Sequence, residues 1–162
     1  MLFCCFGSGR CICVGKKDTT AFYDTCDFSL SKLKYTAFYD VLFKECKLTG
    51  TDFSSCNLFS SFRFGQCQMR YVNFRKMKMI KTSFTMCDMA GADFANANLQ
   101  GSFFGQCDLS GAMFDNTDLT AADFSIAYNR GVIPGNNKLK NAVFSRFNIE
   151  GLVVHLGIKL KD

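Results

Sequence analysis

The chain has 162 residues, of which 48% are hydrophobic, and its formal net charge is +5 at pH 7. This length corresponds to one domain, and the modest positive balance hints at anionic partners. The sequence contains no run of about 18 apolar residues, which excludes a membrane-spanning helix, and its apolar opening lacks the basic start of a secretory signal, so none is expected.

Residues 1–20 are expected to form a non-repeat N-terminal extension. Four cysteines crowd a Gly-rich stretch there, and two lysines follow: Cys4, Cys5, Cys11, Cys13, Lys16 and Lys17. An acylated cysteine pair, a small metal-binding knuckle, a weakly packed chain end and a wrongly chosen upstream start codon are alternative interpretations. The last two interpretations, a weakly packed end and a wrongly chosen start codon, are favoured, because no second ligand group or membrane-facing pattern accompanies the cysteines.

Residues 21–126 carry an apolar centre at every fifth position, in two runs. The first run has centres at Tyr23, Phe28, Leu33, Phe38, Phe43, Leu48, Phe53 and Leu58. The second has centres at Phe64, Met69, Phe74, Met79, Phe84, Met89, Phe94, Leu99, Phe104, Leu109, Phe114, Leu119 and Phe124. A mostly small residue stands two places before each centre. The register slips by one residue across 59–61, and we expect a corner or a bulge to absorb the extra residue.

A period of five fits neither an α-helix, where the centres would drift around the cylinder, nor a flat strand, where alternate centres would change face. A chain that turns a corner every five residues keeps every centre inside, which predicts a solenoid. Cys67, Cys87 and Cys107 recur every twenty residues, which indicates four sides per coil. The predicted aromatic core columns are Phe64, Phe84, Phe104 and Phe124 on one side and Phe74, Phe94 and Phe114 on the opposite side.

Units such as Ala92–Asn96, Ala97–Gly101 and Ala122–Ile126 resemble those of the pentapeptide-repeat family, over roughly two thirds of the chain. The resemblance implies an all-β fold, a right-handed quadrilateral parallel β-helix with one coil per four repeats. Qnr-type members of this family bind DNA gyrase or topoisomerase through an acidic rod that resembles duplex DNA, so the resemblance also offers gyrase binding as a role.

The cysteines of the repeat occupy the small inward position, where a thiol behaves as a small hydrophobe. Stacked coils would hold their side chains parallel and about 4.8 Å apart, whereas a disulfide requires Cβ atoms near 3.8 Å that incline towards each other. A reduced cysteine column is therefore expected, which indicates a cytoplasmic protein. A metal site is not expected, because the chain has a single His.

The outward charges are segregated along the chain. A candidate charged surface carries six basic residues with no acid among them: Arg63, Arg70, Arg75, Lys76, Lys78 and Lys81. Six acids without a base follow: Asp88, Asp93, Asp108, Asp115, Asp118 and Asp123. Two interpretations stay open, a solvated surface whose signs happen to cluster and a docking surface for a charged partner.

Residues 127–162 are expected to form a loop and a C-terminal cap. The loop contains the only Pro of the chain, Pro134, and a short amphipathic helix is predicted to cover the open end of the coil. In similar family members this cap can pair two rods, so the resemblance implies a homodimer. The candidate cap and dimer residues are Leu152, Val153, Leu156 and Ile158.

No catalytic constellation and no cofactor motif is found in the sequence, so an enzyme is not expected. The leading hypothesis is a non-catalytic interaction rod with an unidentified protein partner. Gyrase binding with quinolone protection is the alternative, although the chain departs from the Qnr type in its basic belt and positive net charge. Direct nucleic-acid binding is not expected, because the basic belt lacks interleaved exposed aromatic residues.

Overall fold

The computed structural model describes residues 12–17, 20–33, 37–56, 58–128 and 136–146. The remaining residues, including the predicted cap with Leu152, Val153, Leu156 and Ile158, lie outside the described residues. Within the described part of the chain, no helix is long and apolar enough to cross a membrane.

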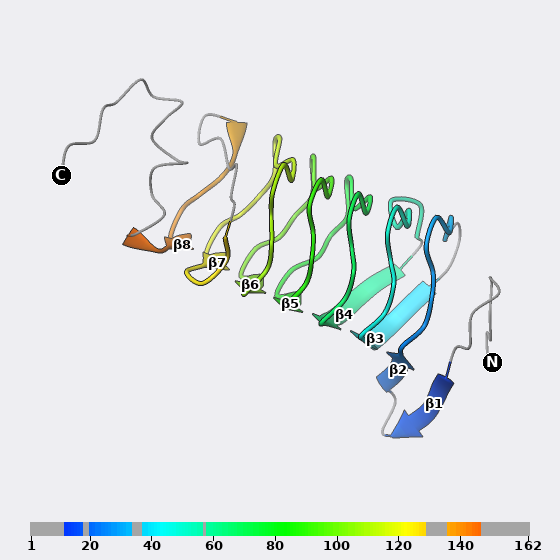
Figure 1. Ribbon diagram of the computed structural model, residues 1–162. Helices are drawn as coiled ribbons and strands as arrows, with labels where there is room; N and C mark the ends of the chain where they lie inside the picture. Colours follow the sequence, from blue (N-terminus) through cyan, green and yellow to red (C-terminus); the bar gives the residue numbers. More distant parts are fainter. Residues whose placement is uncertain (1–11, 18–19, 34–36, 57, 129–135, 147–162) are drawn as a thin grey trace.

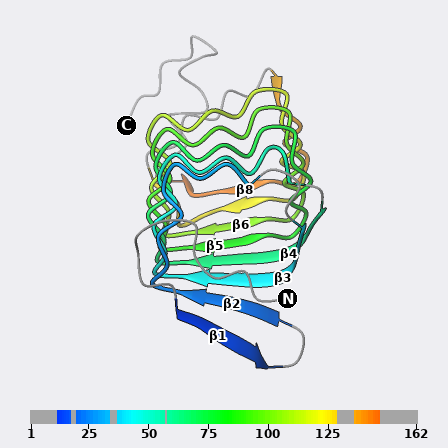
Figure 2. The same ribbon diagram turned by 90° about the vertical axis from the view of Figure 1, so that its right-hand side faces the viewer.

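Coils follow one another along a rod, as Figure 1 shows, and all the strands belong to one sheet (Figure 2). The strands are β1 (Ile12–Lys17), β2 (Thr20–Asp24), β3 (Ala37–Lys44), β4 (Leu58–Gly65), β5 (Ser83–Thr85), β6 (Phe103–Gly105), β7 (Asp123–Phe124) and β8 (Val143–Phe144). Strands β2 to β8 pair in parallel and in chain order. The predicted right-handed parallel β-helix of the pentapeptide-repeat type is confirmed.

Strand β1 differs from the rest, because it pairs antiparallel with β2 and joins Ile12 to Asp24 and Val14 to Phe22. This strand lies in the N-terminal extension, for which a weakly packed end was the favoured expectation. Residues 12–17 are thus paired as a strand, with hydrogen-bonded neighbours in β2. The physical reason is that the first coil leaves a row of unpaired backbone groups along β2, and an antiparallel strand satisfies them.

The other three walls are built from single-residue parallel bridges, except that β3 and β4 begin on the fourth wall, where Ala37 pairs with Leu58. On the second wall Gln68 pairs with Asp88 and Asp88 with Asp108. On the third wall Asn73 pairs with Asp93, and the fourth wall joins residues 78, 98, 118 and 138 in one column. We number the walls in chain order, the first being the one that contains β2 to β8.

The register locates the extra residue of the predicted slip. Asp52 pairs with Lys32, whereas Leu58 pairs with Ala37 and Phe59 with Phe38. Five positions separate Lys32 from Ala37 and six separate Asp52 from Leu58, so the extra residue lies between 52 and 58. The slip predicted at 59–61 is therefore placed too late. From Ala37 and Leu58 onward, β3 and β4 pair without a further shift in register. Leu58 and Phe59 are both apolar, so the sequence pattern alone does not decide which of them is the centre.

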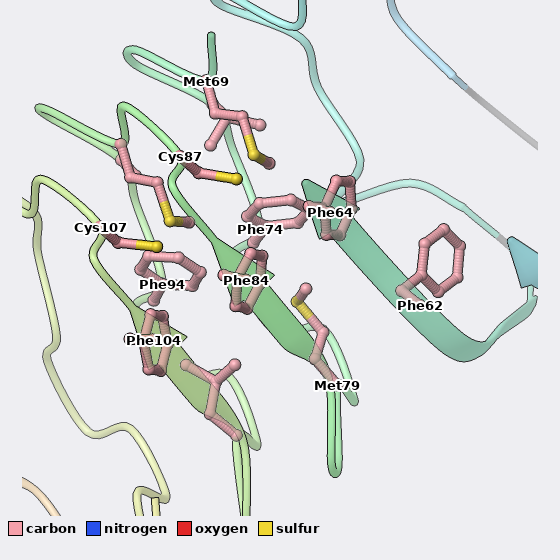
Figure 3. Packing of buried hydrophobic residues seen from close by; sticks show 14 of the residues in the cluster. Phe62, Phe64, Met69, Phe74, Met79, Phe84, Cys87, Phe94, Phe104 and Cys107 are labelled. Atoms are coloured by element: carbon pink, nitrogen blue, oxygen red, sulfur yellow. The ribbon is translucent and has the colours of Figure 1, made fainter. Parts of the chain in front are cut away.

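Two columns of aromatic rings fill the interior (Figure 3). On the first wall, Phe64 stacks on Phe84 with ring centroids 5.2 Å apart, and Phe84 stacks on Phe104 at 5.0 Å. This column consists of Tyr23, Phe43, Phe64, Phe84, Phe104, Phe124 and Phe144. The third wall supplies the facing column, Phe53, Phe74, Phe94 and Phe114. Rings of the two columns meet edge to face across the axis, as the favourable quadrupole geometry requires.

Most corners use a left-handed backbone conformation two residues after a centre. Five successive corners, at residues 66, 71, 76, 81 and 86, have φ between 54° and 60°, and none of them is a glycine. A non-glycine residue in this region costs roughly 1–2 kcal/mol. The fold accepts that cost at most corners because the corners turn every centre inward.

Candidate interaction surface

The cysteines predicted to line the core form no chemical site. Cys67, Cys87 and Cys107 are buried, and each thiol donates a hydrogen bond to the backbone carbonyl two residues before it. A hydrogen bond with Cys107, together with burial, raises the pKa of Cys87 to about 12. These thiols are free, and the raised pKa keeps Cys87 protonated at neutral pH. In the described ranges, no group of three or more His, Cys, Asp or Glu side chains could hold a metal ion.

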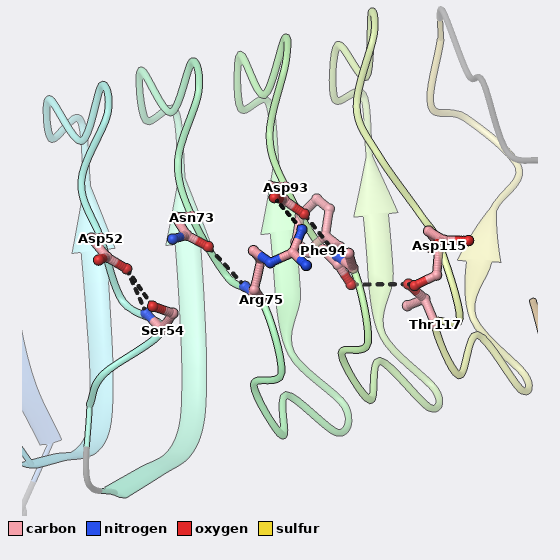
Figure 4. A network of polar contacts seen from close by, with 9 residues as sticks. Asp52, Ser54, Asn73, Arg75, Asp93, Phe94, Asp115 and Thr117 are labelled. Carbon is pink, nitrogen blue, oxygen red and sulfur yellow. Dashed lines mark hydrogen bonds and ion pairs between the residues drawn. The ribbon is translucent and has the colours of Figure 1, made fainter.

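The outward acids have a structural role at the corners. An Asp or Asn one place before a centre accepts a hydrogen bond from the backbone N–H two residues later, as Asp93 does from Ala95 at 2.9 Å. The same bond occurs at Asp52 and Asn73, shown in Figure 4. The full set is Asp27, Asp52, Asn73, Asp88, Asp93, Asn98, Asp108, Asp118 and Asp123. The acidic segment therefore reflects corner geometry repeated along the chain.

The arginines of the basic belt reach acids on neighbouring coils. Arg70 Nε lies 2.6 Å from Asp88 Oδ2, and Arg75 Nη1 lies 3.0 Å from Asp93 Oδ2 (Figure 4 shows the second pair). Both pairs join residues eighteen positions apart, across one coil boundary. Arg63 reaches instead to the preceding coil, where its Nη2 lies 3.6 Å from Asp40 Oδ1. Three of the six basic residues of the predicted charged surface therefore form ion pairs within the molecule.

The three lysines behave differently. Lys76, Lys78 and Lys81 are exposed, and within the described part of the chain none of them forms an ion pair. They lie on the fourth wall and its two bounding corners, since Lys78 is on the wall and the other two are corner residues. The structure therefore separates the belt into paired arginines and unpaired lysines.

Two further lysines share that wall and were missed from the sequence. Lys138 ends the column of bridges through residues 78, 98 and 118, and the carbonyl of Lys140 accepts a hydrogen bond from the N–H of Ala121 at 2.8 Å. Both side chains are exposed. The twenty-residue period contains the signal, because 138 is three coils beyond 78. The run of apolar centres breaks after Phe124, however, so the sequence does not predict that the same wall continues to these lysines.

Asp118 is the one acid in this column. Partial burial alone would raise its pKa, but hydrogen bonds from Gln100 and Thr120 and the charge of Lys138 hold the pKa of Asp118 below its ordinary value. Gln100 Nε2 donates to Asp118 Oδ2 at 2.9 Å, and Lys138 Nζ lies 3.6 Å from the same oxygen. Asp118 is ionised at neutral pH, and its charge is largely compensated by its neighbours.

Some exposed apolar side chains on the corners cover glycines of the next coil. Tyr71 is 68% exposed, yet its ring would lie 2.6 Å from a Cβ built on Gly91. Leu30 similarly covers Gly50, where the distance would be 2.8 Å. Packing along the corner explains these residues, so they are not evidence of an apolar binding patch.

Comparison with known proteins agrees with this geometry. A family model described as "Pentapeptide repeat region" matches residues 59–127, and a second, "Pentapeptide repeats (8 copies)", matches residues 26–58. Together the two models cover well over half of the chain. A search of curated protein sequences found no match.

Several solved structures are similar to this one. A trypsin-treated variant of QnrB1, a plasmid-mediated fluoroquinolone resistance protein, has a TM-score of 0.66 and 20% identity over 86% of this chain and 68% of its own. A second QnrB1 variant has a TM-score of 0.51 and 19% identity over 86% of this chain and 87% of its own. Rfr23, a pentapeptide repeat protein from the cyanobacterium Cyanothece 51142, matches at 0.45 and 16% over 78% of this chain and 82% of its own. At these identities the likeness to the two QnrB1 variants shows a shared fold.

Proposed function

The chain belongs to the pentapeptide-repeat family, and we propose that it is a non-catalytic rod that binds a protein partner in the cytoplasm. One observation carries the proposal: Lys76, Lys78 and Lys81 are exposed on a rigid wall, and no ion pair occupies them in the described part of the chain. The other charged groups largely serve the rod itself, in corner hydrogen bonds and coil-to-coil ion pairs. Charged side chains that have no partner within the molecule and are fixed on a rigid scaffold favour electrostatic recognition of another protein.

The chemistry of the side chains supports a binding role over a catalytic one. A nucleophilic cysteine requires a thiolate, whereas the pKa of Cys87 is raised to about 12. The carboxylates of Asp88 and Asp93 accept backbone hydrogen bonds and face arginines, so neither is poised as a general acid or base.

Affinity capture from the native host tests this proposal. The tagged full-length protein is used as bait, beside a variant in which Lys76, Lys78 and Lys81 are all changed to Gln. We expect one protein to be enriched by the unmodified bait and to be recovered poorly with the variant at low ionic strength. Repeated failure to enrich any protein in replicate captures would count against a binding role.

A second candidate is binding to DNA gyrase or topoisomerase with protection from quinolones. Its support is the structural likeness to QnrB1, a fluoroquinolone resistance protein, and the run of acids from Asp88 to Asp123 without a base. Gyrase supercoiling under a quinolone, with and without the protein, is the direct assay. The candidate predicts restored supercoiling at micromolar protein, and unchanged inhibition would remove it.

A further inference from the structure

We propose that the fourth wall binds an extended acidic protein segment whose carboxylates fall in two groups about four residues apart. The fourth wall is defined by the buried centres Met79, Leu99 and Leu119, by the partly buried centre Leu139 and by the outward residues that flank them. This inference rests on the proposed role as a protein-binding rod and specifies the chemistry of the partner.

Positive charge is concentrated on this wall. The lysines of the wall and its bounding corners are Lys76, Lys78, Lys81, Lys138 and Lys140, all of them exposed. Among the described residues the wall holds two acids, and both are engaged: Asp40 with Arg63, and Asp118 with Lys138. On the second and third walls, basic residues are matched or outnumbered by acids in the described part of the chain. An anionic partner is therefore attracted to one side of the rod.

The lysines form two rows at a fixed separation. The first row is Lys76, Lys78 and Lys81, and the second is Lys138 and Lys140, three coils further along. With neighbouring parallel strands about 4.8 Å apart, three coils separate the rows by roughly 14 Å. An extended chain advances about 3.3 Å per residue, so a segment that lies along the rod axis covers this distance in about four residues.

The surface between the rows favours a peptide over a nucleic acid. Asn98 and Asp118 occupy the column between Lys78 and Lys138. A phosphate backbone carries a charge at every nucleotide and would place one against Asp118, whereas a peptide can place a neutral residue there. The arginines that would form bidentate contacts with phosphate already pair with acids. Ile80, 37% exposed between Lys78 and Lys81, offers an apolar contact that suits a side chain of a peptide.

Two fluorescein-labelled peptides of equal composition provide the first test. Both contain four Glu and eight neutral residues, but one spaces two Glu pairs four positions apart and the other groups all four together. Fluorescence anisotropy with the full-length protein at low ionic strength is expected to show about tenfold tighter binding of the spaced peptide. Equal affinities would overturn the proposed two-row match.

Charge-matched variants provide the second test. The wall variant changes Lys76, Lys78 and Lys81 to Gln, and the control changes Lys32, Lys44 and Lys47, which lie on the other three walls, to Gln. The net charge falls equally in both. We expect the wall variant to bind the spaced peptide about tenfold more weakly and the control to bind it nearly as well as the unmodified protein. Equal losses in the two variants would overturn the assignment to the fourth wall.

Competition identifies other occupants of the wall. If a duplex DNA fragment or vesicles rich in anionic lipid displaced the spaced peptide more effectively than the unlabelled peptide does, the proposal of a protein segment would be overturned. The outcome for the proposed function is separate. A captured host protein that binds the wall variant unchanged would refute the fourth-wall site and leave the protein-binding rod intact, whereas the absence of any captured partner would count against the rod itself.

Discussion

Replacing Phe94 by Ala tests whether the interior is one continuous aromatic stack. Phe94 is fully buried and lies between Phe74 and Phe114, with ring centroids at 5.5 and 5.0 Å. It also meets Phe84 and Phe104 edge to face, at 6.2 and 6.0 Å. Truncating a buried Phe costs about 3–5 kcal/mol, and with four ring neighbours, each worth about 0.5–1.5 kcal/mol, we expect a value at the upper end of that range.

Phe144 provides the matched comparison. It is the last described ring of the first-wall column, is only partly buried and stacks on Phe124 at 5.2 Å. Among the described rings it has no other stacking partner, so Phe144→Ala should cost about 1–2 kcal/mol. In a solenoid the interior coil contacts two neighbours and the terminal coil one. The expected difference between the two alanine variants is therefore about 2 kcal/mol or more.

Urea denaturation followed by far-ultraviolet circular dichroism measures both losses from the midpoint and the slope. Since a loss near 5 kcal/mol approaches the whole stability of a marginal domain, Phe94→Leu is included and should cost about 1–2 kcal/mol through lost ring contacts. If Phe94→Ala and Phe144→Ala were equally destabilising, or if Phe94→Leu were neutral, the continuous stack would be refuted.

Three other predictions address the corners, the acids and the thiols. Gly91→Ala should destabilise the protein more than Gly111→Ala does. Both glycines have positive φ, but only at Gly91 would the new Cβ meet a ring, that of Tyr71 at 2.6 Å. Adding Tyr71→Ala should remove the difference in the thermal unfolding temperature. Asp93→Asn keeps the corner hydrogen bond and should cost under about 1 kcal/mol, whereas Asp93→Ala loses it and should cost about 1 kcal/mol more in urea denaturation. Because the folded-state pKa of Cys87 is raised from 9.0 to about 12, its contribution to stability is complete below pH 9 and is lost as pH rises to 12. Thermal scans should show an alkaline decline to which this thiol adds up to about 1.4 kcal/mol per pH unit. Cys87→Ala should make the decline shallower without removing it, because the pKa values of Cys56 and Cys67 are also raised to about 12.

The core could be predicted from the sequence because it depends on spacing alone. Residues two places before each centre and at the centre itself point inward, and Phe64, Phe84 and Phe104 stack at the twenty-residue interval that the sequence indicates. The position of the extra residue could not be predicted in the same way. Leu58 and Phe59 are both apolar, and only the hydrogen-bonded register of β3 with β4 decides between them.

Strand β1 escaped prediction for a different reason. Residues 12–17 carry no five-residue pattern, and their pairing depends on the open edge that the first coil leaves at β2. Such an edge is a property of the assembled rod. A segment that has no periodicity can therefore still be recruited as a strand where an unpaired edge lies next to it in the chain.

Charges that are segregated along the sequence need not be segregated on the surface of the folded rod. In the sequence, the arginines Arg70 and Arg75 belong to one basic block and Asp88 and Asp93 to a separate acidic block. In the rod these blocks lie on adjacent coils, so side chains eighteen positions apart neutralise each other. A five-residue solenoid thus converts a charge boundary in the chain into one ion pair on the second wall and one on the third. The fourth wall keeps its charge because the residue facing Lys78 on the next coil is Asn98 and not an acid. The identity of the residue one coil later, and not the local charge density, decides which lysines remain open to a partner.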